Sequence, residues 1–524
     1  MSAFVQKHQK VIFLALLALV SLGAGWYIAD CTKYAPWGFS DSAAYLSAAR
    51  NFAAGRGLGL FNPNGGFAPL MIFAPFYSVF LSLFALLKID LITAARVMDI
   101  VFFAALIAAS GWLLYLITRS FWVSLCFAVM ITTTPALGVS FTSIMSDPLA
   151  MVLGIPGFLL LIYALKVDST KWLILSAFLA ALALLTRYAF VAFPAAGVLC
   201  IALLSNKPLR GRVRDLLKYG IVSFMPMLVW VGQQLLSKYS VGSRTYSMDF
   251  SFTAKVSQFA SQAVVVLKYW LPYRTNMIPG VSADLFRPIL LLFLAAVIVI
   301  GLFLSLKKPK TSERGSGETL ALALSVVIAA YMAVLLVIYS VSTEIISIDD
   351  RMLAPLIPVY YSLLLTCALL ISRIVHPRIT MPLIGILIAA FFVVFNFQPF
   401  MAYPIVVGNY PNGYTYPIWK ENPILTGEVA LPQDRPLITN APDILLFYTN
   451  RSAYTLSVSD QSSLDNLIHT QCAVLVLFDP VATHRFEQLP NAVSSADVAA
   501  LQNQLDTLYS SASGVILADN KCSR

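Results

Sequence analysis

Charged residues are scarce in this chain of 524 residues. They make up 11% of the sequence, whereas a typical soluble domain has about 25%, and hydrophobic residues make up 59%. This composition predicts a polytopic membrane protein. It also argues against a nucleic-acid partner despite the net charge of +10, because the basic residues are spread through short loops between apolar runs, where they orient membrane helices.

Cysteines are few as well, and the six that are present show no metal-binding spacing. Cys126, Cys200 and Cys367 lie inside apolar runs, where a thiol behaves as a small hydrophobe. Cys472 and Cys522 lie in or beside two strands expected near the C-terminus. An oxidising compartment would allow these two to form a disulfide, and two unpaired thiols are the alternative.

Internal repeats and low-complexity tracts are also missing, so apolar runs define the organisation. Residues 11–28 follow Lys7 and Lys10 and predict an uncleaved first span, since the run is long and "WYIADC" is a poor signal-peptide cleavage site. Runs near 20 residues, enough to cross about 30 Å of hydrocarbon, lie at 91–118, 147–165, 218–236, 288–306, 319–341, 353–372 and 380–402.

Two further stretches complete a set of about eleven predicted transmembrane helices. These are 121–136 and 172–204, and Arg187 with Tyr188 divides the latter into two short helices. Residues 69–87 are different, because Pro75 leaves only twelve apolar residues behind it, or roughly 18 Å of helix. We expect this re-entrant segment to enter the membrane and turn back.

Positive charge sets the orientation of the bundle in the plasma (inner) membrane. The loops at 119, 166–171, 207–218, 307–314 and 373–378 carry fourteen Lys and Arg residues and should share the cytoplasm. If residues 69–87 turn back, the N-terminus is cytoplasmic and the C-terminal region is extracytoplasmic. If that segment crosses instead, the N-terminus is forced outward, and Asp41 is separated from the other polar clusters.

Beyond residue 402 the composition becomes that of a soluble domain. We expect a transmembrane domain over 1–402, with a first outer loop at 29–90 and a long outer loop at 237–287, and an extracytoplasmic α/β domain over 403–524. In the latter, "RPLITN", "AYTLSV", "CAVLVLF" and "GVILAD" predict strands, and residues 441–449, 462–469 and 495–509 predict helices.

Polar residues interrupt the apolar pattern at several places that this topology puts on one face. Asp41 begins a helix of small residues in "SDSAAYLSAARNFAAGRG", and Asp147 lies in "SIMSDP". The simpler alternatives are that Ser40 or Asp41 caps its helix, that the helix is interfacial and amphipathic, and that Asp147 before Pro148 starts the next span.

Arg187 lies between two apolar stretches, a costly position that marks function by default. The alternative is an arginine that extends to the membrane surface or pairs with a neighbouring helix. Arg351, in "SIDDRM", follows Asp349 and Asp350, and a local salt bridge to either is its alternative. Together the interruptions indicate a shared cavity on the outer face.

Such a cavity suits the transfer of a sugar from a lipid phosphate. Arginines hold a phosphate by charge-assisted hydrogen bonds, and Arg187 and Arg351 are the first candidates. The acceptor hydroxyl needs a base within hydrogen-bond reach, for which Asp41 is the candidate. Cations also stabilise the departing anion. Further candidate phosphate-binding residues in the long outer loop are Arg244, Lys268 and Arg274.

These motifs, with "AARVMD", "LLTRYAF" and "DDRMLAPLIPVYY", resemble the polyprenyl-phosphate-sugar-dependent glycosyltransferases of the GT-C superfamily. The protein O-mannosyltransferase and lipid A aminoarabinose transferase relatives look nearest. The resemblance covers the membrane half well and the C-terminal domain loosely. It implies a bundle of many transmembrane helices, inverting transfer by direct displacement, a catalytic aspartate at Asp41, a second acid at Asp147, and phosphate-facing cations at Arg187 and Arg351.

No cofactor is predicted. Metal-dependent members of the superfamily have a D-x-D or D-N-E pattern in these loops, whereas the matching places here read "SDS" and "SDP". The adjacent Asp349 and Asp350 are the remaining argument for a divalent metal. In the glycosyltransferase hypothesis these two residues take supporting roles, as do Tyr45 and Tyr188.

The predicted partners are a polyprenyl-phosphate sugar, an acceptor hydroxyl on a glycan, lipid or protein, and the bilayer. A flippase or transporter of lipid-linked glycan is the main alternative, because carriers also place ionisable residues within helices. The internal symmetry and midplane polar breaks typical of carriers are not seen in the sequence. A lipid-diphosphate-dependent glycan ligase or polymerase is a further alternative, and the sequence specifies neither the sugar nor the acceptor.

Overall fold

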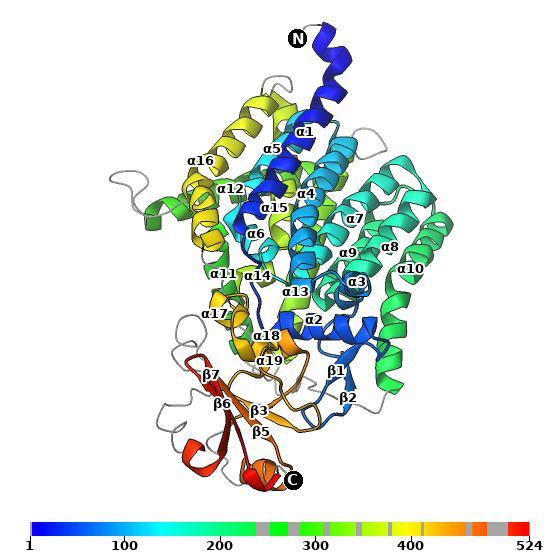
Figure 1. Ribbon diagram of the computed structural model, residues 1–524. Helices are drawn as coiled ribbons and strands as arrows, with labels where there is room; N and C mark the ends of the chain where they lie inside the picture. The colour runs from blue at the N-terminus through cyan, green and yellow to red at the C-terminus, as the bar shows by residue number, and fades with distance from the viewer. Residues whose placement is uncertain are drawn as a thin grey trace.

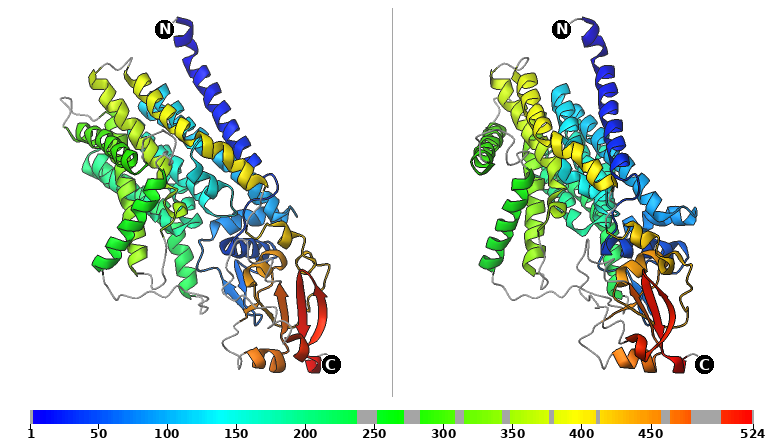
Figure 2. Two further views of the ribbon diagram at one scale, coloured as in Figure 1. Left: turned by 90° about the vertical axis from the view of Figure 1, so that its left-hand side faces the viewer. Right: turned by 60° about the vertical axis from the view of Figure 1, so that its left-hand side comes forward.

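The protein consists of a helical bundle with a small sheet beyond one end of it. The computed structural model describes residues 3–236, 252–270, 283–307, 315–341, 348–375, 380–409, 413–456, 464–478 and 501–522. Figure 1 shows the N-terminus at the far end of the bundle and the C-terminus beside the sheet. The two views in Figure 2 show the same separation of bundle and sheet.

The bundle is built from long apolar helices and shorter companions. In chain order they are α1 (Ala3–Cys31), α4 (Leu91–Thr118), α5 (Phe121–Thr132), α6 (Pro135–Phe141), α7 (Asp147–Val167), α8 (Thr170–Thr186), the 3-10 helix η1 (Tyr188–Val191), α9 (Ala192–Leu204), α10 (Leu209–Leu236), α11 (Phe252–Trp270), α12 (Ala283–Leu306), α13 (Ser316–Val341), α14 (Asp350–Leu353), α15 (Leu356–Val375) and α16 (Thr380–Asn409). Buried apolar residues from most of these helices form one continuous core.

Among the described residues, six helices are long and apolar enough to cross a membrane, and eight if each of two bent helix pairs counts as one span. Three shorter apolar helices, Thr170–Thr186, Tyr188–Leu204 and Leu291–Leu306, occupy further places where the sequence predicts spans. Many large apolar side chains on these helices are exposed on the outside of the bundle, as expected for helices that lie in lipid. The chain is an integral membrane protein.

Two of the breaks in the described helices concern α5 and α8. α5 and α6 meet at a bend of 67°, where Pro135 begins α6, because proline lacks the N–H that would continue the preceding helix. α8 ends at Thr186 and η1 begins at Tyr188, which confirms that Arg187 divides the apolar stretch 172–204.

The segment that follows α1 lies between the bundle and the sheet. It forms α2 (Ser40–Ala53), a hairpin of β1 (Gly59–Phe61) and β2 (Phe67–Pro69), and α3 (Phe76–Leu86). α3 has 11 residues, or roughly 16 Å of helix, and is too short to cross a bilayer alone. Figure 1 shows it beside α2, at the end of the bundle that faces the sheet.

The C-terminal region contains a five-stranded mixed sheet in the order β4-β3-β5-β7-β6. β3 is parallel to β4 and β5, and β7 is antiparallel to β5 and β6. The elements are α17 (Pro417–Lys420), α18 (Pro423–Thr426), β3 (Leu437–Thr439), α19 (Pro442–Thr449), β4 (Tyr454–Thr455), the π-helix η2 (Asn466–Thr470), β5 (Val474–Phe478), β6 (Asp506–Ser511), β7 (Gly514–Ala518) and the 3-10 helix η3 (Asn520–Cys522). All four predicted strands are present, and α19 matches the helix predicted at 441–449.

One predicted element is wrong. Residues 495–500 lie outside the described residues, but the second half of the helix expected over 495–509 is the strand β6 (Asp506–Ser511). A serine-rich turn before Gly514 folds β6 back against the buried strand β7, and Thr507 and Tyr509 are residue types that favour a strand. The structure also joins Cys472 and Cys522 in a disulfide, which resolves the alternatives for these thiols.

The first outer loop is attached to the C-terminal region by backbone contacts. The Tyr414 amide donates to the Gly38 carbonyl over 2.9 Å, and the Thr415 hydroxyl donates to the Pro36 carbonyl over 2.7 Å. Gly413 has a φ of +65°, and a Cβ on it would lie 2.1 Å from the Gly38 carbonyl oxygen. Only glycine permits this close approach with a left-handed backbone.

Side chains of α2 extend the same attachment. Arg50 donates to the Phe447 carbonyl at 2.7 Å, and Asn450 donates to Asn51 at 3.0 Å. Asn51 in turn donates to the Gly59 carbonyl at 2.9 Å, which holds the β1 strand. The helix that begins at Ser40 is therefore clamped between the bundle and the C-terminal sheet.

This clamp is tested by substituting Gly413. Gly413→Ala should lower thermal stability in detergent more than Gly427→Ala does, because Gly427 has a similar φ of +83° but no atom within 4 Å of its added Cβ. The Gly427 variant should cost about 1–2 kcal/mol from backbone strain alone. Equal destabilisation of the two variants would mean that the close approach of Gly413 to Gly38 does not contribute to stability.

Candidate functional site

The loop between α6 and α7 contacts the start of α2 at the candidate site. Its backbone pairs with the segment before α2: the Trp37 amide donates to Thr142, and the Ile144 amide donates to Trp37, each at 2.8 Å. The Ser42 hydroxyl, in the first turn of α2, donates to the Ile144 carbonyl at 2.7 Å. These contacts fix the start of α2 against the "SIMSDP" loop.

Asp41 lies in the first turn of α2, after the N-cap residue Phe39. The Phe39 amide donates to the Ser42 hydroxyl, so Ser42 and not Asp41 serves this end of the helix. The Asp41 carboxylate instead accepts from the Arg351 Nη2 at 3.4 Å. Charge-assisted hydrogen bonds are usually about 2.7–2.9 Å long, so this contact is loose, and each side chain is 30% exposed.

Arg351 is placed by the short helix α14. Asp349 caps that helix by accepting from the Met352 amide at 2.8 Å, and the Tyr331 hydroxyl of α13 donates to the Met352 carbonyl at 3.0 Å. The Arg351 Nη1 contacts the Met145 Sδ at 3.0 Å. Its Nε is buried and has no hydrogen-bond partner among the described residues. A buried, unsatisfied guanidinium nitrogen is costly and indicates a missing acceptor.

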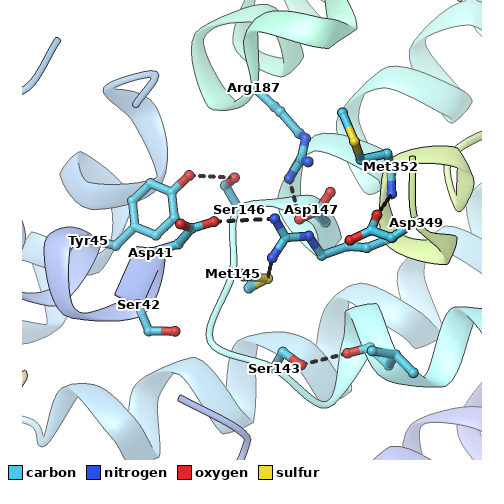
Figure 3. Close-up of polar contacts among 12 residues, drawn as sticks. Asp41, Ser42, Tyr45, Ser143, Met145, Ser146, Asp147, Arg187, Asp349 and Met352 are labelled. Atoms are coloured by element: carbon cyan, nitrogen blue, oxygen red, sulfur yellow. Dashed lines mark hydrogen bonds and ion pairs between the residues drawn. The ribbon is translucent and has the colours of Figure 1, made fainter. Parts of the chain in front are cut away.

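Asp147 and Arg187 form a second, deeper ion pair. Asp147 is the first residue of α7 and Arg187 follows the last residue of α8, so the pair joins the ends of two neighbouring helices. The Asp147 side chain is completely buried and that of Arg187 is 19% exposed. One Asp147 oxygen, Oδ1, has no partner among the described residues. Figure 3 shows this pair beside Asp41, Met145 and Ser146.

Two tyrosines, Tyr45 and Tyr188, link the segments around the two ion pairs. The hydroxyls of Tyr45 and Ser146 lie 2.9 Å apart, which ties α2 to the loop before α7. The Tyr188 hydroxyl contacts the carbonyl oxygens of Met71 and Phe73 at 3.2 Å each. Tyr188 therefore connects the break at Arg187 with the chain that leads into α3.

Four predicted site residues thus meet in one cluster, although they come from four separate parts of the sequence. Asp41 pairs with Arg351, and Asp147 pairs with Arg187. In the described structure Arg351 does not pair with its neighbours Asp349 or Asp350, since Asp349 caps α14. Burial raises the pKa of Asp350, and the charge of Asp349 raises it further.

The structure does not test the cations predicted in the long outer loop. Arg244 and Arg274 lie outside the described residues, and Lys268 lies in α11 with a side chain that is likewise outside them. Within the described residues, no group of three or more His, Cys, Asp or Glu side chains could hold a metal ion.

Sequence reasoning missed the contribution of the C-terminal region. Asp443, in the first turn of α19, lies 3.5 Å from the Tyr414 hydroxyl. Burial raises the pKa of Asp443, the Tyr414 hydroxyl opposes this effect, and the charge of Asp41 adds to it. Asp443 is therefore within electrostatic reach of Asp41. No local signal marks it, because its position depends on how the two regions pack.

No family model and no curated protein matches the sequence. Solved structures do match. ArnT from Cupriavidus metallidurans is similar in its apo state, with a TM-score of 0.57 at 13% identity, and bound to undecaprenyl phosphate, with a TM-score of 0.56 at 12% identity. Both matches cover 98% of this chain and 98% of ArnT.

The chain has the GT-C fold. The arabinofuranosyltransferase AftD from Mycobacteria is also similar, with a TM-score of 0.54 at 16% identity. That match covers 97% of this chain and 42% of AftD, so the chain spans less than half of AftD. At these identities the likeness concerns the fold, and it confirms the fold class expected from the sequence motifs.

The deeper ion pair is tested by a double-mutant cycle. Arg187→Gln leaves the buried Asp147 charge unpaired and should lower the free energy of unfolding by about 3–5 kcal/mol. Adding Asp147→Asn removes that charge, so the double variant should be more stable than Arg187→Gln alone. Denaturation in detergent is measured for the unsubstituted protein, for Arg187→Gln, for Asp147→Asn and for the double variant. Strictly additive losses would contradict the pairing.

The raised pKa of Asp443 predicts a pH-dependent effect. A carboxyl whose pKa is raised by folding costs stability when charged, and that cost is absent below its ordinary pKa of about 4 and grows as the pH rises above it. Asp443→Asn should therefore increase the melting temperature at pH 7.5 and change it little near pH 4. The exposed Asp506 provides the control, Asp506→Asn, and a stabilisation independent of pH would contradict the assignment.

Proposed function

We propose that this protein is an integral membrane glycosyltransferase that moves a sugar from a polyprenyl-phosphate donor to an acceptor hydroxyl at the outer face of the membrane. The observation that carries the proposal is the loose contact between Asp41 and Arg351, with an unsatisfied buried Nε on Arg351. The Asp41 carboxylate and the Arg351 guanidinium, whose Nε lacks a hydrogen-bond acceptor among the described residues, therefore lie side by side in a protein with the GT-C fold. The ArnT structure with bound undecaprenyl phosphate supports the same class of donor.

The donor phosphate is proposed to bind at Arg351. A phosphate oxygen supplies the acceptor that Nε lacks, and a planar guanidinium binds a phosphate with paired hydrogen bonds. Arg187 lies deeper in the protein than Arg351, and its ion pair with Asp147 holds it in place. Its positive charge contributes to the electrostatic potential at the proposed phosphate site. Arg244, Lys268 and Arg274 remain proposed contributors from the long outer loop.

Transfer proceeds in this proposal by direct displacement. The acceptor oxygen attacks the anomeric carbon and forms the new glycosidic bond, while the bond from that carbon to the phosphate oxygen breaks and the polyprenyl phosphate departs with the electron pair. Asp41 takes the proton of the attacking hydroxyl. Attack opposite to the departing phosphate inverts the anomeric centre, and Arg351 stabilises the charge that develops on the phosphate.

The proposed orientation puts the N-terminus in the cytoplasm and the C-terminal domain (403–524) on the extracytoplasmic side. The disulfide between Cys472 and Cys522 supports this, because such bonds persist in oxidising compartments. The clamp between α2 and α19 also supports it, since a sheet attached to the Asp41 helix must share its side of the membrane. The domain is then placed to contribute to acceptor binding.

The proposal is tested with purified protein and a radiolabelled polyprenyl monophosphate sugar, by measuring sugar release and transfer to envelope acceptors. Asp41→Asn should lower kcat about 10²–10⁴-fold, the usual contribution of a general base. Asp30→Asn, an exposed carboxylate at the end of α1, is the matched control and should be active. A well-folded Asp41→Asn protein with normal transfer would show that the base is wrongly assigned.

Arg351 is tested in the same assay. Arg351→Gln should raise KM for the donor and lower kcat, whereas Arg351→Lys, which keeps the charge, should retain more activity. Equal activity of the Gln variant and the unsubstituted protein would remove Arg351 from the donor site. Movement of the lipid-linked sugar across vesicles without its consumption would instead indicate the carrier function.

A further inference from the structure

A cavity lies at the opposite end of the bundle from the Asp41 cluster. It has a volume of about 360 Å³, is partly open, and is lined by residues where α7 and α9 end and where α8 and α10 begin. α7 runs between the two sites, from Asp147 to Val167, over roughly 30 Å. Because four apolar helices start or stop around it, this cavity is at the level where the hydrocarbon core gives way to lipid headgroups.

Charges of both signs line the cavity. Lys207 lies between two carboxylates, at 2.5 Å from Asp168 and 2.6 Å from Asp215. Lys166 also lines the cavity, and its ammonium group is held by the carbonyl oxygens of Leu116 and Ile117 at the end of α4. The lining side chains include two lysines and two aspartates, and Arg212 donates to the carbonyls of Ser205 and Lys207 beside them, so a simple anion or a simple cation meets repulsion as well as attraction.

Asp215 shows that a partner is missing. The residue is 1% exposed and contacts Lys207 through Oδ2, whereas its Oδ1 has no hydrogen-bond partner among the described residues. A buried carboxylate oxygen without a donor is costly. The group that completes the site must therefore bring an N–H or O–H donor, and a positive charge would strengthen the bond.

We propose that this cavity binds the headgroup of an amine-bearing phospholipid. The primary ammonium donates to Asp215 Oδ1, and the phosphate lies toward Lys166. A zwitterion with separated charges matches the alternating lysines and aspartates, and the location among helix ends lets the acyl chains remain in the bilayer. This site is distinct from the proposed transfer reaction and does not depend on it.

The test is native mass spectrometry of the delipidated full-length protein with single lipids. Phosphatidylethanolamine should bind about tenfold more tightly than phosphatidylcholine, whose methylated nitrogen has no N–H to donate, and more tightly than phosphatidylglycerol. Asp215→Asn should abolish the preference. Glu318→Gln, which removes a carboxylate in the first turn of α13 that pairs with Arg373 in the last turn of α15, should keep it.

Asp168→Asn provides a second variant if Asp215→Asn does not fold, because the Asp168 side chain is 68% exposed. It should reduce the preference for phosphatidylethanolamine, because Lys207 then pairs with Asp215 alone and neutralises the carboxylate that would bind the lipid ammonium. Equal binding of the three lipids to the unsubstituted protein, tightest binding of phosphatidylglycerol, or an unchanged preference in both Asp variants would overturn the proposal. The assay contains no sugar donor, so its outcome is independent of the transferase assignment.

Discussion

The burial of charge inside an apolar bundle is the constraint on which the site depends. Asp147 is completely buried, and a charge there is tolerable only because Arg187 meets it. That pair fixes where α7 begins and where α8 stops. The start of α7 and the end of α8 are therefore at the same end of the bundle. The pair of Asp41 and Arg351 lies nearby and is more exposed.

The elements around this pair are held by contacts that link distant parts of the chain. The segment before α2 lies between the loop at 142–146 and the residues 413–415, and each side supplies backbone hydrogen bonds. α2 then carries Asp41 on one side and Arg50 on the other, where Arg50 holds α19. A movement of the C-terminal sheet would consequently be transmitted to Asp41.

Much of this arrangement could be predicted from the sequence, because lipid imposes strong and local rules. Long apolar runs become helices, and a charged residue inside a run marks a break, as at Arg187. The bend at Pro135 was not predicted, because proline alone is an ambiguous signal: α7 continues through Pro156. The strand at 506–511 could not be predicted in the same way. Its conformation is decided by the turn and by the buried partner strand β7, and both depend on residues outside the segment.

The choice of ion-pair partners within the cluster also could not be predicted from neighbouring residues in the sequence. Arg351 follows two aspartates directly, yet its ion pair is with Asp41, which is 310 positions away in the sequence. The nearest acid, Asp350, belongs to the same short helix, and Asp349 is engaged by the helix backbone. Only the packing of α14 against the "SIMSDP" loop, seen in the contact of Arg351 with Met145, brings the right partner close.

The most direct test of the central claim is the sidedness of the segments that supply the cluster. Single cysteines replacing the exposed residues Tyr34, Asp349 and Lys171 would be treated with a membrane-impermeant thiol reagent in intact cells, and the labelled sites would be identified by mass spectrometry. We expect labelling at 34 and 349 and protection at 171. Labelling of only one of 34 and 349 would place Asp41 and Arg351 in different compartments and contradict the site.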